Sequence, residues 1–162
     1  MFKFEFSDKQ KVKRVIVLGS DGFVGKELCS NLKKNKINFI PVNRKKIDLK
    51  NKKSINKLIN VLNVDDIVIF IAGVVPVKDI NMFQENIEIC FNITNALLKK
   101  DIAHLVYISS DAVYKDSKKL ISEKSKTGPD NLHGLMHLFR ENILKLHFKK
   151  NLCIIRPTLI YG

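Results

Sequence analysis

An α/β fold built on a doubly wound parallel sheet is predicted by three features of this sequence of 162 residues. An apolar run over residues 15–18 ends in glycines at positions 19, 22 and 25, and a helical pattern follows at once from residue 23. Further along the chain, short apolar runs alternate with helical patterns, as expected for right-handed βαβ units. Hydrophobic residues form 45% of the sequence, which is enough for the core of one domain of common size.

The strands are predicted from the apolar runs, since strands of a parallel sheet are buried on both faces. Gly73 and Pro76 mark the loop after the fourth strand, and Gly128-Pro129 precedes the last long helix. We expect strands near residues 13–19, 37–42, 46–49, 66–71, 104–109 and 152–156, and helices near 23–35, 54–62, 80–100 and 134–149. These elements predict the Rossmann strand order 3-2-1-4-5-6, with helices on both faces of the sheet. Residues 13–162 form the predicted domain, and the basic residues 1–12 are interpreted as a tail or an extra edge strand.

The net charge of +13 is explained by a lysine-rich, solvated surface. The lysines are scattered in pairs, and no long basic tract is interleaved with aromatic residues as in many nucleic-acid sites. An anionic small substrate is the second explanation of the charge. We therefore expect no nucleic-acid partner.

Three cysteines and the absence of long apolar runs indicate the compartment. No run approaches the roughly 20 residues of a membrane span, and the first residues carry no signal-peptide pattern. Cys29, Cys90 and Cys153 are far apart and odd in number, which fits neither a disulfide framework nor a metal site. We expect a cytoplasmic protein with buried, reduced thiols and no membrane partner.

The glycine-rich turn predicts a phosphate site. Gly19 would make the turn, Gly22 would let a pyrophosphate approach the backbone, and Gly25 would let the helix pack on the sheet. The amide groups at the start of a helix carry a partial positive charge and bind anions. Because both the preceding strand and the following helix are visible in the sequence, a nicotinamide dinucleotide is the expected ligand.

The end of the second expected strand indicates which dinucleotide. An acidic residue near this position would bind the ribose 2′-hydroxyl of NAD, whereas an arginine accommodates the 2′-phosphate of NADP. The sequence has Asn43 and Arg44 there, followed by two lysines. NADP is therefore preferred over NAD, and the alternative is that Arg44 is one more surface cation.

Six segments match one known family in order: residues 19–25, Ile47-Asp48-Leu49, residues 70–73, Asn86, residues 106–114 and residues 156–162. They resemble the cofactor-binding half of the extended short-chain dehydrogenase/reductases, the epimerase/dehydratase family that acts on sugar nucleotides. The resemblance implies a nucleotide-sugar substrate and is shared by epimerases, dehydratases and reductases. It also implies a set of cofactor-binding residues: Gly19, Gly22, Phe23, Val24, Gly25, Asp48, Leu49, Ala72, Gly73, Ser109 and Pro157, in addition to Arg44.

The catalytic pair departs from the family pattern. The family uses a Tyr-x-x-x-Lys pair at the start of the helix after the serine strand, but this sequence has His133 and His137 at those positions. Ser110 would hold the reacting oxygen of the substrate, His133 would act as acid and base, and His137 would contact the ribose of the cofactor. A literal Tyr-x-x-x-Lys occurs at Tyr114 and Lys118, but it lies too close to Ser110 to be the expected pair.

Two alternatives to an active histidine site stay open. The first is a site without activity on an intact dinucleotide-binding fold, which would make the protein a binding or scaffold protein. The second is metal binding by the histidine pair, which lacks an evident third ligand, so we expect no metal.

The chain also stops where family members continue into a substrate domain, so it is either a fragment or a short form. An exposed Ile160 at the last strand would then favour association into a homo-oligomer.

Overall fold

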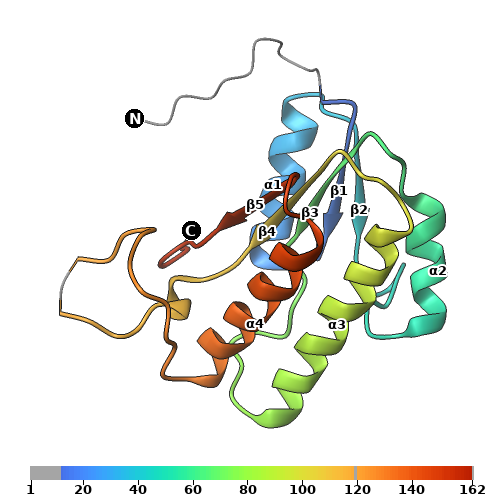
Figure 1. The fold of residues 1–162 in the computed structure, drawn as a ribbon. Helices are drawn as coiled ribbons and strands as arrows, with labels where there is room; N and C mark the ends of the chain where they lie inside the picture. The colour runs from blue at the N-terminus through green and yellow to red at the C-terminus, as the bar shows by residue number, and fades with distance from the viewer. Residues whose placement is uncertain (1–11, 119, 162) are drawn as a thin grey trace.

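The computed structural model describes residues 12–118 and 120–161, and within them five parallel strands form one sheet in the order β2-β1-β3-β4-β5 (Figure 1). The strands are β1 (Arg14–Leu18), β2 (Phe39–Val42), β3 (Asp66–Phe70), β4 (His104–Ile108) and β5 (Leu152–Ile155). In β1, the residues from Val15 to Leu18 are all buried, as expected for a central strand covered on both faces. The predicted fold class is therefore confirmed.

The strand expected at residues 46–49 is wrong. The backbone amides of Lys46 and Ile47 both donate to the carbonyl of Asn43, which makes a turn directly after β2. The amide of Asp48 then donates to the hydroxyl of Ser54 rather than to a neighbouring strand. Ile47 and Leu49 belong to this loop, and their side chains are buried, which explains their apolar character. The predicted order 3-2-1-4-5-6 thus loses its outer strand 3, while the five strands that form keep the predicted arrangement.

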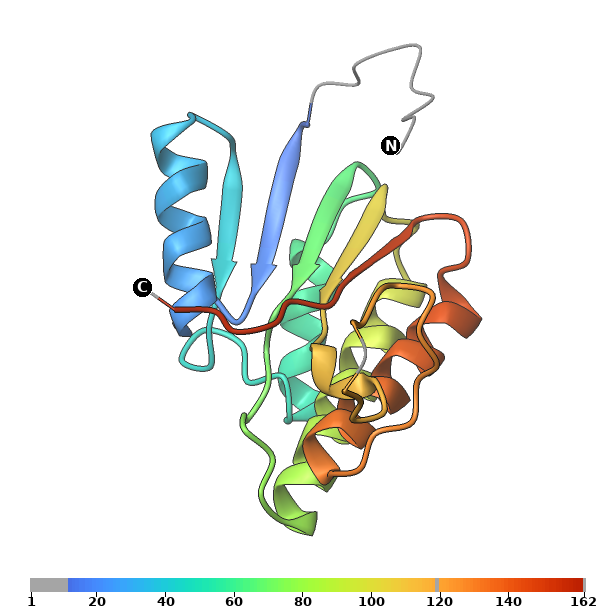
Figure 2. The ribbon, with the colours of Figure 1, turned by 90° about the vertical axis from the view of Figure 1, so that its left-hand side faces the viewer.

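Helices cover both faces of the sheet, as Figure 2 shows. On one face, α1 (Phe23–Lys34) packs on β1 and β2 around Val15, Val17 and Leu32. On the other face, α3 (Ile80–Leu98) lies between α2 (Lys52–Val61) and α4 (Leu132–His147) and contacts both. Of the helices in the described part of the chain, none has the length and apolar character needed to cross a lipid bilayer.

The outer end of the sheet is less well covered on the α1 side. Leu152 and Ile154 of β5 pack toward the core under α4, so Cys153 and Ile155 face the other way and are exposed. The prediction of three buried thiols is therefore correct for Cys90, which is buried, but not for Cys29, which is half-buried, and it is wrong for Cys153, which is exposed. Ile160 is also exposed, and association through it stays a prediction. The tail or edge strand expected at residues 1–12 lies outside the described residues except for the exposed Val12.

Candidate functional site

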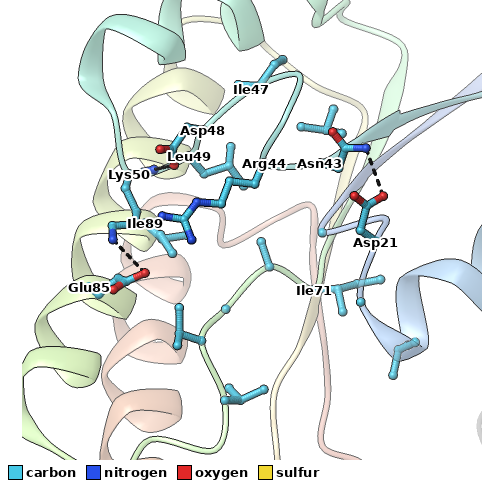
Figure 3. A pocket seen from close by; sticks show the side chains of 18 of the residues that line it. Asp21, Asn43, Arg44, Ile47, Asp48, Leu49, Lys50, Ile71, Glu85 and Ile89 are labelled. Carbon is cyan, nitrogen blue, oxygen red and sulfur yellow. Dashed lines mark hydrogen bonds and ion pairs between the residues drawn. The ribbon is translucent and has the colours of Figure 1, made fainter.

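A cavity of about 370 Å³ opens at the carboxyl ends of β1, β2 and β3 (Figure 3). The chain leaves β1 into α1 on one face of the sheet and leaves β3 toward α3 on the other face. The crevice between two such strands is where open α/β sheets bind their ligands. The volume is within the range of small-molecule and cofactor sites.

Two of the three glycines in the turn are required by the fold itself. Gly19 has a φ of +98°, a conformation that favours glycine, and a Cβ there would lie 2.8 Å from the backbone of Ala72. A Cβ on Gly25 would overlap the carbonyl oxygen of Gly19. These contacts set the close packing of α1 against the end of β1.

Gly22 is different, because the fold does not require it. A Cβ there would meet only the Gly19 carbonyl, at an ordinary 3.5 Å, and its φ of −70° and ψ of 169° are open to any residue. Gly22 lines the cavity, so a side chain at this position would occupy space on the cavity side. A ligand that approaches the backbone closely is the physical reason for a glycine here.

The start of α1 also fits an anionic ligand. Side chains of Asn51, Asp79 and Asn131 cap α2, α3 and α4, but the N-cap of α1 is Gly22, which offers no side-chain acceptor. The first amides of α1 therefore have no capping group from their own N-cap residue. Since Gly22, Phe23 and Val24 line the cavity, this helix terminus opens onto it and suits the pyrophosphate of a dinucleotide.

Polar and charged side chains surround the other side of the cavity. Figure 3 shows Arg44 reaching into the cavity toward the side formed by Lys50 and Glu85, which form an ion pair of 2.9 Å. Asn43, at the end of β2, donates from its side-chain amide to the carboxylate of Asp21. Sequence reasoning missed Lys50, Glu85 and Asp21, because their place at the cavity depends on how β1, the loop after β2, and α3 come together.

Most of the predicted cofactor residues lie at this cavity, namely Gly19, Gly22, Phe23, Val24, Arg44, Asp48, Leu49, Ala72 and Gly73. Gly25, Ser109 and Pro157 are not among its lining residues. The hydroxyl of Ser109 is buried and donates to Glu141 at 2.7 Å, and the carbonyl of Pro157 accepts from the amide of Asp111. A cofactor role for Ser109 and Pro157 stays a prediction.

The catalytic candidates meet where α4 begins. Gly134 allows this contact, because a Cβ there would overlap the carbonyl oxygen of Ala112 in the short helix η1 (Asp111–Val113) that follows β4. The first turn of α4, which includes His133, thus packs on the segment of Ser110. The Ser110 hydroxyl accepts from the amide of Ala112 at 3.1 Å and lies 3.2 Å from a carboxylate oxygen of Asp111.

The two histidines lie together, as the spacing on the helix predicts. Their ring centroids are 4.7 Å apart, with the rings nearly perpendicular. His137 is buried, and its Nδ1 lies 2.7 Å from the hydroxyl of Tyr107. Burial, the neighbouring His133 and Arg140 lower the pKa of His137 to about 3, so the ring is neutral near pH 7. His137 therefore does not carry the positive charge that a lysine would have at this position.

His133 is more accessible and faces a different set of groups. Its Nδ1 lies 3.5 Å from the backbone amide of Val77, at the limit of a hydrogen bond. Burial lowers the pKa of His133, Asp111 opposes this shift, and Arg140 adds to it. Among the described residues, no group of three histidines, cysteines or carboxylates could hold a metal ion.

The alternative pair Tyr114 and Lys118 has another setting. The hydroxyl of Tyr114 accepts from Arg156 at 2.8 Å, and Arg156 also forms two hydrogen bonds with the buried carboxylate of Glu141. Lys118 is exposed on the loop after η1. Tyr114 therefore belongs to the ion-pair network that joins α4 to the end of β5, apart from the histidine pair.

Similarity to known proteins extends over most of this chain. The model of the NAD dependent epimerase/dehydratase family matches residues 15–162. The N-acetyl-alpha-D-glucosaminyl-diphospho-ditrans,octacis-undecaprenol 4-epimerase of Escherichia coli O157:H7 is 26% identical over 91% of this chain and 49% of its own length. The chain thus spans about half the length of that relative.

Solved structures show the same fold. The dTDP-4-dehydrorhamnose reductase of Bacillus anthracis, in complex with NADP, has a TM-score of 0.78 and 24% identity over 94% of this chain and 55% of the reductase. The UDP-N-acetylglucosamine 4-epimerase of Bacillus cereus has a TM-score of 0.77 and 25% identity over 92% of this chain and 54% of the epimerase. The similarity to each covers only about half of the solved chain.

Proposed function

Because this chain belongs to the NAD-dependent epimerase/dehydratase family, we propose that it binds a nicotinamide dinucleotide and acts on a nucleotide-linked sugar. The observation that carries the proposal is Gly22, which the fold does not require and which lines the cavity at the uncapped start of α1. The names of the reductase and the epimerase with the same fold support a sugar nucleotide as the substrate class.

Different residues around the cavity would bind different parts of the dinucleotide. The turn at Gly22 and the start of α1 would hold the pyrophosphate, and Asp48 and Leu49 would contact the adenine. Arg44 would bind a 2′-phosphate, and the cavity-lining side chain at the end of β2 is Asn43 rather than a carboxylate, so NADP is preferred over NAD. When bound, the dinucleotide supplies or accepts the hydride of the reaction.

The histidine pair would perform the proton transfer. Ser110 would hold the oxygen of the reacting sugar carbon, and His133 would exchange a proton with that oxygen. Because Nδ1 of His133 faces the amide of Val77, Nε2 is the nitrogen left for this exchange. His137 would orient His133 through the edge-to-face contact between their rings.

The experiment that tests the cofactor site is a titration with NADPH and with NADH, followed by nicotinamide fluorescence. We expect saturable binding, tighter for NADPH. Arg44→Ala should weaken NADPH binding about tenfold, or about 1.4 kcal/mol, and leave NADH binding nearly unchanged. Lys45→Ala, which removes a charge from the exposed neighbour, is the matched control. A folded chain that binds neither dinucleotide would contradict the proposal.

A non-catalytic dinucleotide-binding protein is the second candidate function, and the neutral, buried His137 favours it. The two candidates differ in hydride transfer from NADPH to a nucleotide-linked 4-keto sugar. Turnover that is lost in His133→Ala, with NADPH binding intact, supports the enzyme. Binding of NADPH without any turnover by the wild-type chain supports the second candidate.

A further inference from the structure

Arg140 is a buried cation that has no anionic partner among the described residues. Its side chain is only 1% exposed, and among the described residues no carboxylate forms an ion pair with it. The other two arginines that reach into the interior are neutralised, Arg14 by Asp66 and Arg156 by Glu141. Burying an unpaired charge is expensive.

Neutral oxygen atoms hold the guanidinium of Arg140 in place. Nε and Nη2 donate to the carbonyl of Asn86 at 3.0 and 2.7 Å, and Nη2 also donates to the side-chain oxygen of Asn86 at 2.8 Å. Nη1 donates to the carbonyl of Ala72 at 3.1 Å, and the ring of Phe70 lies 5.1 Å from the guanidinium carbon. Hydrogen bonds and the aromatic face therefore stabilise the charge without cancelling it.

This charge lies directly behind the wall of the cavity. Ala72 and Gly73 line the cavity, and a Cβ on Gly73 would be 3.3 Å from Nη1 of Arg140 and 3.0 Å from the side-chain oxygen of Asn86. Arg140 thus occupies the space on the side-chain side of Gly73. The same guanidinium fixes the carbonyl of Ala72, so the turn after β3 is held from behind by a residue of α4.

On its other side, Arg140 acts on the histidine pair. It follows His137 by three residues on the same face of α4. The hydroxyl of Tyr107 is a third group in this cluster: burial raises the pKa of Tyr107, the charge of Arg140 lowers it, and the hydroxyl lies 2.7 Å from His137 Nδ1. The positive charge of Arg140 therefore acts on both partners of this hydrogen bond.

We propose that Arg140 is the fixed cation of this site, a positioning residue that holds the Ala72–Gly73 turn and places beside the histidine pair the positive charge that His137 does not carry. The inference rests on the proposed function for the purpose of the site. The family pattern has a lysine at the position of His137. In this chain the positive charge lies about one helical turn further along α4, on Arg140.

The expected consequence is that His137 does not gain a proton near neutral pH, and that Arg140 also keeps the pKa of His133 below its ordinary value. Burial is the largest cause that lowers the pKa of both rings; the neighbouring His133 adds to it for His137, and the charge of Arg140 adds to it for both. Asp111 of η1 opposes this effect on His133, and Glu141 of α4 opposes it on His137. Removing the charge of Arg140 should therefore raise both pKa values.

The test is an NMR titration of the histidine ring carbons in the chain without dinucleotide, assigned with single histidine-to-glutamine variants. In the wild type, His137 should stay neutral down to at least pH 5. Arg140→Met and Arg140→Gln, two neutral replacements of different polarity, should raise the pKa of His137 by about one unit or more. Arg140→Lys, which keeps the charge, should stay within about 0.3 unit of the wild type.

Lys145→Met is the matched control, because it removes a partly exposed cation from the same helix. A folded neutral variant with unchanged titration, or an equal shift in Lys145→Met, would overturn the proposal. If neither neutral variant folds, the wild type decides, because protonation of His137 above pH 6 would also overturn it. Since no dinucleotide is present, failure here differs from failure to bind NADPH.

Discussion

The three glycines of the turn have different physical roles although the sequence spaces them equally. A Cβ on Gly19 or Gly25 would clash with backbone atoms of the protein. At Gly22, which lines the cavity, there is room for a Cβ. The role of Gly22 at the cavity is therefore separable by mutation from the structural roles of Gly19 and Gly25.

Gly22→Ala should leave the free energy of unfolding nearly unchanged and weaken NADPH binding at least tenfold, because the methyl group meets the ligand rather than the protein. Gly25→Ala is the matched comparison and should destabilise the fold by about 1–3 kcal/mol, since its methyl group would overlap the Gly19 carbonyl. Urea unfolding and nicotinamide fluorescence give the two quantities. Equal effects of both variants on stability would refute the distinction.

At the scale of elements, α4 carries both candidate catalytic histidines and the two charged residues next to them on one face. His133, His137, Arg140 and Glu141 follow the spacing of a helix that presents one side to its neighbours. Glu141 fixes this helix to the end of β5 through two hydrogen bonds from Arg156, and it also accepts from Ser109 of the serine segment. The position of the histidines thus depends on a buried ion pair next to them.

Glu141→Gln should reduce the free energy of unfolding by about 3 kcal/mol at pH 7, because it leaves the charge of Arg156 unpaired. Burial raises the pKa of Glu141, but hydrogen bonds from Arg156, Ser109 and Lys145 outweigh burial, so the pKa lies below its ordinary value of 4.5. A lowered folded-state pKa stabilises the protein above the unfolded pKa, and this contribution disappears as the pH falls.

The difference between wild type and Glu141→Gln should therefore shrink below about pH 4.5, as urea unfolding at several pH values would show. Glu123→Gln, at an exposed position of the loop after η1, serves as the control. A constant difference from pH 7 down to pH 3 would mean that the carboxylate charge of Glu141 does not stabilise the fold.

At the scale of the whole molecule, the main electrostatic feature is the net charge of +13. The charged side chains at the cavity include both signs, with Arg44 and Lys50 near Asp48 and Glu85. This arrangement suits one small anionic ligand better than the regular phosphates of a duplex.

Binding to a short labelled DNA duplex should consequently be weak at 0.15 M salt, with a Kd above about 1 µM, and should fall steeply as salt rises. Fluorescence anisotropy at low and at physiological salt measures both properties. A Kd below about 10 nM at 0.15 M salt would contradict the expectation of no nucleic-acid partner.

A structural feature could be predicted from the sequence where local contacts determine it, and not where contacts between distant segments do. The glycine turn and the helix starts are local, since one residue's backbone freedom or side-chain oxygen decides them. Residues 46–49 misled the prediction because Ile47 and Leu49 alternate as in a strand, while bonds to Asn43 and Ser54 determine the loop. The burial of Cys153 was predicted wrongly because the exposure of its side chain depends on which part of the sheet α1 covers.

The sequence by itself determined the fold class, the family, the place of the glycine turn and the pairing of His133 with His137, because each depends on spacing along one or two neighbouring elements. Only the tertiary structure decided that His137 is buried against Tyr107, and that Arg140 stands behind the Ala72–Gly73 turn. Spacing indicates which residues share a helix face. The charge and hydrogen bonds of that face depend on residues from β3, β4 and α3, which only folding brings together.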